Sequence, residues 1–80
     1  MKILIRNLSR STSEQSLNGL FSEFGAVQSC KLVLDATTGN SKGFAFVEMP
    51  KAGDAKAAIT QLNGKDLDGM KIRVKKTNEQ

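Results

Sequence analysis

Residues 42–49 read KGFAFVEM and place two of the chain's four phenylalanines within three positions. Successive side chains of a β-strand point to opposite faces of a sheet. The uncharged set of alternate residues is Gly43, Ala45, Val47 and Met49, and the other set is Lys42, Phe44, Phe46 and Glu48. Ionised side chains are rarely buried without partners. We therefore expect this strand, which ends before Pro50, to bury its uncharged set and to expose both aromatic rings.

Three further segments, residues 2–7, 29–35 and 70–76, alternate between uncharged and mixed positions and are also predicted to be strands. Their uncharged residues complete one side of a predicted core: Ile3, Ile5, Cys30, Leu32, Leu34, Met70, Ile72 and Val74. Val27 is out of phase with residues 29–35, which predicts a bulge or a later start of that strand.

Two segments between the strands follow the period of an α-helix. Residues 12–24 carry one apolar stripe made of Leu17, Leu20, Phe21 and Phe24. Thr12 with Gln15 three positions later fits a capping box, and Gly25 fits a left-handed residue at the helix end. A second helix is predicted over residues 52–62, stopped by Asn63–Gly64, with an apolar face made of Ala55, Ala58, Ile59 and Leu62.

The predicted order of elements is therefore βαββαβ. Strand–helix–strand crossovers are right-handed, so both helices are expected on the same side of one sheet. This order predicts the α+β class and a ferredoxin-like two-layer sandwich, in which a four-stranded antiparallel sheet carries two helices on one face. Residues 1–76 are predicted to form this single domain, followed by a polar tail over residues 77–80. The second face of the sheet has no predicted cover.

Positive charge is concentrated on this predicted open face. The mixed positions of the other strands add Lys2, Leu4, Arg6, Lys31, Val33, Lys71, Arg73 and Lys75 to it. The face then holds seven cations and one carboxylate, whereas the rest of the chain holds five cations and seven carboxylates. The modest net charge of +4 therefore conceals a strongly basic surface.

The composition argues against catalysis. The 80 residues include no histidine and one cysteine, and they lack a zinc cluster, a Ser–His pair and a GxxxxGK[ST] phosphate loop. We expect no enzyme activity, cofactor, metal or small-molecule substrate. No apolar stretch approaches the roughly 18 residues of a membrane span, and residues 1–8, MKILIRNL, are too short and too soon charged to be expected as a secretory signal. Because the single Cys30 cannot form an internal disulfide, we expect an intracellular, cytoplasmic setting. We also expect a monomer.

Exposed aromatic rings among cations are typical of surfaces that bind single-stranded nucleic acid. Bases stack on such rings with about 1–3 kcal/mol per base, and the cations meet the phosphates. Two other readings stay open at this point. The rings could pack under a terminal segment or a partner subunit, and the lysines of residues 70–76 could protect a sheet edge from aggregation.

The segment KGFAFVEM resembles the RNP1 octamer of the RNA-recognition motif, [KR]-G-[FY]-[GA]-[FY]-[ILV]-x-[FY], at seven of its eight positions. ILIRNL, residues 3–8, is similar to the RNP2 hexamer, and DATTGNSKG, AITQLNG and GMKIRV are also family-like. The resemblance covers nearly the whole chain. A single module of this length is similar to the small single-domain RNA-binding proteins of bacteria and equally to a domain of a longer protein. The resemblance implies that Lys42 meets a phosphate, and that Phe44 and Phe46 meet the sugar–base region and stack a base.

Two positions depart from the family pattern. Leu4 holds the second place of the hexamer, where the family usually has an aromatic residue, so the resemblance implies weaker binding or a shifted register of the RNA. Met49 replaces the final aromatic residue of the octamer. By its alternation Met49 points into the core, where it acts as an adaptable filler.

We therefore predict a module that binds single-stranded RNA. Stacking and phosphate contacts would serve single-stranded DNA equally well, so the choice of RNA rests on the resemblance. The predicted RNA-binding residues are Lys2, Leu4, Arg6, Lys31, Lys42, Phe44, Phe46, Lys71, Arg73, Lys75 and Lys76. Residues 76–78 are also expected to read Watson–Crick edges. The alternatives are a protein–protein interaction module on the same fold and, more remotely, an enzyme in which Arg10 holds an anion.

Overall fold

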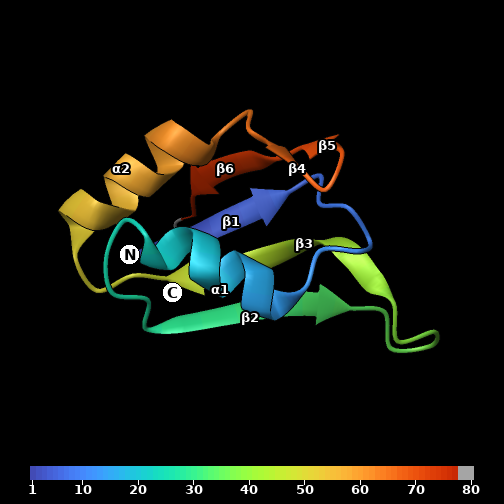
Figure 1. Ribbon diagram of the computed structural model, residues 1–80. Coiled ribbons are helices and arrows are strands. Elements are labelled where there is room, and N and C mark those ends of the chain that lie inside the picture. Colours follow the sequence, from blue (N-terminus) through green and yellow to red (C-terminus); the bar gives the residue numbers. More distant parts are fainter. Residues whose placement is uncertain (78–80) are drawn as a thin grey trace.

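The computed structural model describes residues 1–77, which form a four-stranded antiparallel sheet backed by two helices (Figure 1). The elements are β1 (Lys2–Arg6), α1 (Glu14–Ser22), β2 (Ser29–Leu34), β3 (Ser41–Glu48), α2 (Ala52–Leu62), β4 (Asp66–Leu67), β5 (Met70–Lys71) and β6 (Arg73–Lys76). The strand order of the sheet is β2-β3-β1-β6, and both helices lie on one of its faces. The ferredoxin-like two-layer sandwich predicted from the sequence is therefore confirmed.

The core lies between the sheet and the helices and contains the uncharged side of β1, β3 and β6, with Cys30 and Leu32 of β2 partly buried against it. The central pairs Ile3–Val47 and Ile5–Ala45 join β1 to β3, and all four side chains are fully buried. The buried helix residues are Leu17 and Phe21 from α1 and Ala55, Ala58 and Leu62 from α2. Met49 is fully buried as well, as its alternation predicts.

Leu34 and Met70 were expected in the core, but they are 53% and 39% exposed. The pairing of β2 with β3 shifts between Leu32 and Leu34, so the irregularity lies at this end of β2 and not at Val27. This shift carries Leu34 out of the alternation that partly buries Leu32 against the core. Because β2 begins at Ser29, the later strand start expected from Val27 is confirmed, and the alternative of a bulge at Val27 is not.

Met70 belongs to a separate two-stranded hairpin, β4–β5, rather than to the main sheet. The hairpin turns at Asp68 and Gly69, whose φ angles are 51° and 87°. Two consecutive positive φ values at an Asp-Gly pair are the pattern of a type I′ turn. The fourth strand of the sheet therefore begins at Arg73, three residues later than predicted.

The start of α1 also differs from the prediction. Ser13 is the N-cap, and its hydroxyl oxygen accepts a hydrogen bond of 3.1 Å from the backbone N–H of Ser16. Thr12 is instead buried and donates its hydroxyl to the carboxylate of Asp68 at 2.7 Å, which ties the start of α1 to the β4–β5 turn. At the other end Gly25 has a φ of 155°, so the predicted left-handed cap is not formed.

One glycine shapes the strand that carries the aromatic rings. Gly43 has a φ of 85° inside β3, and its carbonyl accepts a hydrogen bond of 2.9 Å from the N–H of Leu8. A β-carbon at this position would lie 3.3 Å from the Leu8 carbonyl oxygen. The strand start and the chain after β1 are therefore held together at a point that only glycine fits without strain.

We predict that Gly43→Ala lowers the free energy of unfolding by about 1–3 kcal/mol, because alanine pays for the positive φ and presses on the Leu8 carbonyl. Urea unfolding followed by circular dichroism measures the change. The matched control is Gly19→Ala in α1, where a β-carbon meets nothing within 4 Å. That control should gain about 0.5–1 kcal/mol, and equal stability of the Gly43 variant and the wild type would refute the assignment.

Candidate nucleic-acid interface

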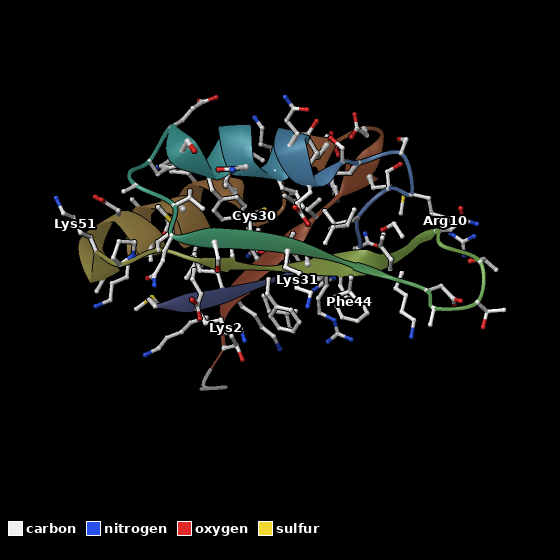
Figure 2. All side chains as sticks on the ribbon, turned by 90° about the horizontal axis from the view of Figure 1, so that it is seen from below. Lys2, Arg10, Cys30, Lys31, Phe44 and Lys51 are labelled. Carbon is white, nitrogen blue, oxygen red and sulfur yellow. The ribbon has the colours of Figure 1, made fainter. Side chains whose placement is uncertain are left out.

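The two phenylalanines of β3 form the apolar centre of the sheet face that carries no helix. Both rings are half-buried, and their centroids lie 6.2 Å apart with an interplanar angle of 89°. The ammonium nitrogen of Lys2 lies 4.9 Å from the centroid of the Phe46 ring, within the range of a cation–π contact. Figure 2 shows Phe44, Lys2 and Lys31 on the side of the sheet opposite the helices. The two rings therefore stand on the open face, as expected from the sequence.

A single row of side chains crosses all four strands through Phe46. Phe46 pairs with Lys31 of β2 on one side and with Leu4 of β1 on the other, and Leu4 pairs with Lys75 of β6. Residues directly opposite one another in a sheet project from the same face. The row therefore has an apolar middle and one lysine at each edge of the sheet.

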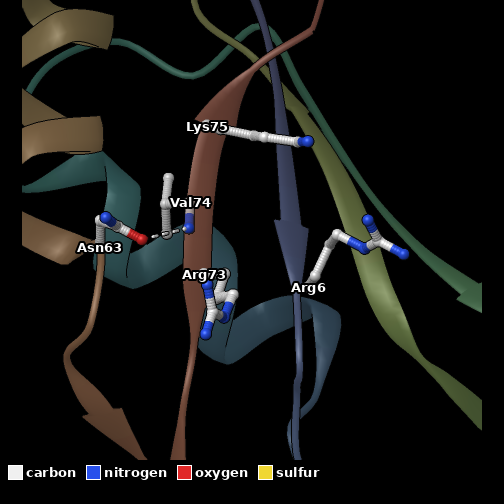
Figure 3. Close-up of a pocket in the computed structure, with 5 residues that line it drawn as sticks. All are labelled: Arg6, Asn63, Arg73, Val74 and Lys75. Carbon is white, nitrogen blue, oxygen red and sulfur yellow. Dashed lines mark hydrogen bonds between the residues drawn. The ribbon is translucent and has the colours of Figure 1, made fainter.

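A second group of cations lies beside this row, on β1 and β6. Arg6 and Arg73 are directly paired, and together with Lys75 they line a hollow of about 300 Å³ (Figure 3). Asn63 closes its outer side and accepts a hydrogen bond of 3.1 Å from the Val74 N–H. Like charges directly opposite one another destabilise a sheet. In Figure 3 the two guanidinium groups point away from each other, so each can meet an anion at a different place.

The loop end of the open face holds a third cationic region. Arg10 and Lys42 line a hollow of about 300 Å³ together with Phe44. The β2–β3 loop borders this region, and there Asp35 accepts hydrogen bonds from the N–H groups of Thr37 and Thr38. These bonds, followed by the charges of Lys42 and Arg10, hold the pKa of the Asp35 carboxyl below its usual value. The hydrogen bonds of Asp35 therefore hold the backbone of the loop at residues 35–38, next to Arg10 and Lys42.

Two predicted residues do not lie on the open face of the sheet. Lys71 is part of the β4–β5 hairpin, and its carbonyl accepts a hydrogen bond of 2.6 Å from the side chain of Asn7. Lys76 pairs with the buried Ile3, so it shares the helix side of the sheet. The predicted placement of Lys71 on the face of the main sheet was wrong. The predicted contact of Lys76 with RNA named no face of the sheet and stays a prediction. Asn78, which was expected to read base edges, lies outside the described residues.

Comparison with known proteins identifies the family. The model of the RNA recognition motif matches residues 3–73. The chain belongs to the RNA recognition motif family. The chain is 42% identical over 78 residues to the mitochondrial glycine-rich RNA-binding protein 2 of Arabidopsis thaliana, covering 98% of the chain and 49% of that protein. It is 41% identical over 76 residues to RbpB of Nostoc sp., a provisionally assigned RNA-binding protein, covering 95% and 74% of the two chains.

Solved structures of RNA recognition motifs share the same architecture. The crystal structure of the RNA-binding protein PG1 is 40% identical with a TM-score of 0.96, covering 100% of this chain and 96% of that one. The RNA recognition motif of Rna15 with bound RNA (GU) is 26% identical with a TM-score of 0.88, covering 98% and 83% of the two chains. The family consists of RNA-binding modules and not of enzymes, in agreement with the sequence prediction.

The chain spans about half the length of the Arabidopsis relative, which is mitochondrial by name. The cytoplasmic setting and the monomeric state therefore stay predictions. Within residues 1–77, no helix is long and apolar enough to cross a membrane.

The only cysteine lies on the opposite side of the sheet from the aromatic rings (Figure 2). The thiol of Cys30 contacts the backbone carbonyl of Glu14 in α1 at 3.6 Å. Burial, followed by the charge of Glu14, raises the pKa of this thiol from 9.0 to about 11. The thiol is therefore protonated at neutral pH and unsuited to act as a nucleophile. Across the described part of the chain, no three His, Cys, Asp or Glu side chains gather as metal ligands would.

The sequence prediction of the site missed Arg10, Ser29 and Glu48. Arg10 was considered only in the remote enzyme alternative, and a hydrogen bond between Leu8 and Gly43 joins the chain before it to the start of β3. Glu48 was counted on the open face but given no role. Ser29 pairs with Glu48 across the β2–β3 ladder, and this pairing is set by a register that no local pattern encodes.

Proposed function

We propose that this RNA recognition motif binds single-stranded RNA across the open face of its sheet. The observation that carries the proposal is the row through Phe46, in which an apolar, aromatic centre is flanked by Lys31 and Lys75. RNA-binding relatives and the RNA-bound Rna15 structure support the same function.

The geometry of the two rings favours a single strand over a duplex. Bases in a duplex are stacked parallel to one another, whereas the rings of Phe44 and Phe46 stand at 89°. Two bases that stack on these rings must therefore be unstacked from each other, as in single-stranded RNA whose bases are splayed over a sheet. Each stacked base contributes about 1–3 kcal/mol to binding.

The surrounding cations supply the electrostatic part of the proposed binding. Strands lie about 4.8 Å apart, so Lys31 and Lys75 stand roughly 14 Å from each other across the sheet, room for about two to four nucleotides. Lys2, Arg6, Lys42 and Arg73 lie between or beside them. Contact of these side chains with phosphates releases counterions, which makes the affinity fall as salt is raised. Preference for RNA over DNA needs a contact to the 2′-hydroxyl group.

We predict that the double substitution Phe44→Ala/Phe46→Ala weakens binding to a pool of random nonamer RNAs by about 2–6 kcal/mol, because two stacking surfaces are lost. Fluorescence anisotropy with labelled RNA measures the affinity, and circular dichroism checks that the fold is kept.

Leu34→Ala is the matched control, because it also removes an exposed apolar side chain, but one that lies outside the row through Phe46. The control should bind like the wild type. Retained affinity in the double Phe variant would refute the stacking mechanism, and salt-insensitive binding of a protein ligand would point to a protein-interaction module instead.

Leu4 is the weak point of the proposed surface, because it pairs with Phe46 at the centre of the sheet yet offers no ring. We predict that Leu4→Phe tightens RNA binding by about 1–3 kcal/mol, the contribution of one additional stacked base. The same anisotropy titration measures this gain, with Leu4→Met as a control that keeps the volume without a ring. If Leu4→Phe folds but binds no more tightly than Leu4→Met, a base does not pack at this position.

A further inference from the structure

The open face of the sheet, as far as residues 1–77 describe it, carries one carboxylate among its cations, that of Glu48. Glu48 is half-buried at the end of β3 and pairs with Lys2 on β1 and with Ser29 on β2. The hydroxyl of Ser29 lies 3.5 Å from a carboxylate oxygen of Glu48. This polar row, Ser29–Glu48–Lys2, lies next to the row through Phe46.

The two rows enclose a hollow of about 390 Å³, within the roughly 300–1,000 Å³ range of sites that hold small ligands. Its lining residues are Lys2, Ser29, Lys31, Val33, Phe46 and Glu48. It therefore combines the aromatic ring that the proposed function assigns to a base with hydrogen-bonding groups at one end. A base on Phe46 would present its edge to Glu48 and Lys2.

A carboxylate at this place opposes simple phosphate binding. Glu48 repels phosphate groups, and an ionised carboxylate can only accept hydrogen bonds. Its favourable partner is therefore a neutral group that offers N–H donors. The Watson–Crick edges of the bases are such groups, and the four bases differ in how many donors they present and where.

Guanine is the base whose edge fits this pair of side chains. Its Watson–Crick edge presents a carbonyl oxygen followed by two adjacent donors, N1–H and the N2 amino group. Glu48 offers two acceptor oxygens, and Lys2 offers a donor beside them. Uracil instead presents a single N–H between two carbonyl oxygens, and adenine and cytosine each present one amino group beside an acceptor nitrogen. A carboxylate can accept two hydrogen bonds in parallel from guanine alone.

We propose that the hollow beside Phe46 is a guanine-selective base pocket, in which Glu48 accepts from N1–H and N2–H and Lys2 donates to O6. This inference rests on the proposed RNA binding and adds a sequence preference to it. In the unbound chain the ammonium group of Lys2 lies over the Phe46 ring, 4.9 Å from its centroid, so it lines the hollow. When a base stacks on the ring, this flexible side chain moves to the base edge, where its ammonium group donates to O6.

The test compares five-nucleotide RNAs that differ at their central base: UUGUU, UUUUU, UUAUU, UUCUU and the inosine pentamer UUIUU. Competition anisotropy with the wild-type chain should favour UUGUU over UUUUU by roughly 5- to 150-fold, the range of one bidentate base contact. Inosine keeps N1–H and O6 but lacks the 2-amino group, so UUIUU should fall between the two. A ratio within twofold, or tighter binding of the adenine or cytosine pentamer, would overturn the assignment.

The variant Glu48→Gln should bring the ratio of UUGUU to UUUUU within twofold. It should also raise the affinity for both RNAs at low salt, since a negative charge beside the phosphates is removed. The matched control is Glu23→Gln, the same change at the end of α1 in the helix layer, which should keep the wild-type ratio. A Glu48→Gln variant that keeps the wild-type preference would also overturn the assignment.

The two levels of the proposal fail in different ways. If the wild type binds all pentamers equally and Phe46→Ala loses them all, RNA binding on the open face stands and the guanine pocket does not exist. If the wild type binds no RNA, both proposals fail together.

Discussion

The pairing register of β1 with its two neighbours is the constraint on which the surface depends. Ile3 and Ile5 are fully buried opposite Val47, Ala45 and Val74. Because side chains alternate between faces, this burial fixes the orientation of every other residue in the three strands. A slip of one residue would exchange the two faces and place charged side chains in the core. The aromatic rings and lysines are thus exposed because the aliphatic residues are buried.

The same constraint lets the open face depart from what stability alone would favour. Arg6 and Arg73 are paired although their charges repel, and two phenylalanine rings remain partly in contact with water. Such features cost free energy in the unbound domain, and they are tolerated because packing between the sheet and the helices does not involve them. Exposed apolar groups and like charges opposite one another on one rigid face are features of a binding surface rather than of a second core.

The sequence predicted those parts of the fold that repeat over several residues, and it failed where single contacts decide. The alternation in β1 and β3 and the apolar stripe of residues 52–62 gave the sheet faces and α2. The β4–β5 hairpin has strands of two residues, too short to show a period, so only its Asp-Gly turn signalled it. The sequence analysis assigned no face of the sheet to Lys76 and no role to Glu48. Their neighbours are set by cross-strand pairing, which joins residues that are distant in the chain.

The most direct test of the central claim is to map the RNA contact residue by residue. Amide chemical shifts of the labelled chain would be followed by NMR during titration with a short single-stranded RNA. The account predicts that the largest changes occur at Leu4, Phe46 and Lys75 along the central row, while Gln15 and Lys56 on the helices stay unchanged. Changes concentrated on the helices, or spread evenly over the chain, would contradict the assignment of the open face as the RNA-binding surface.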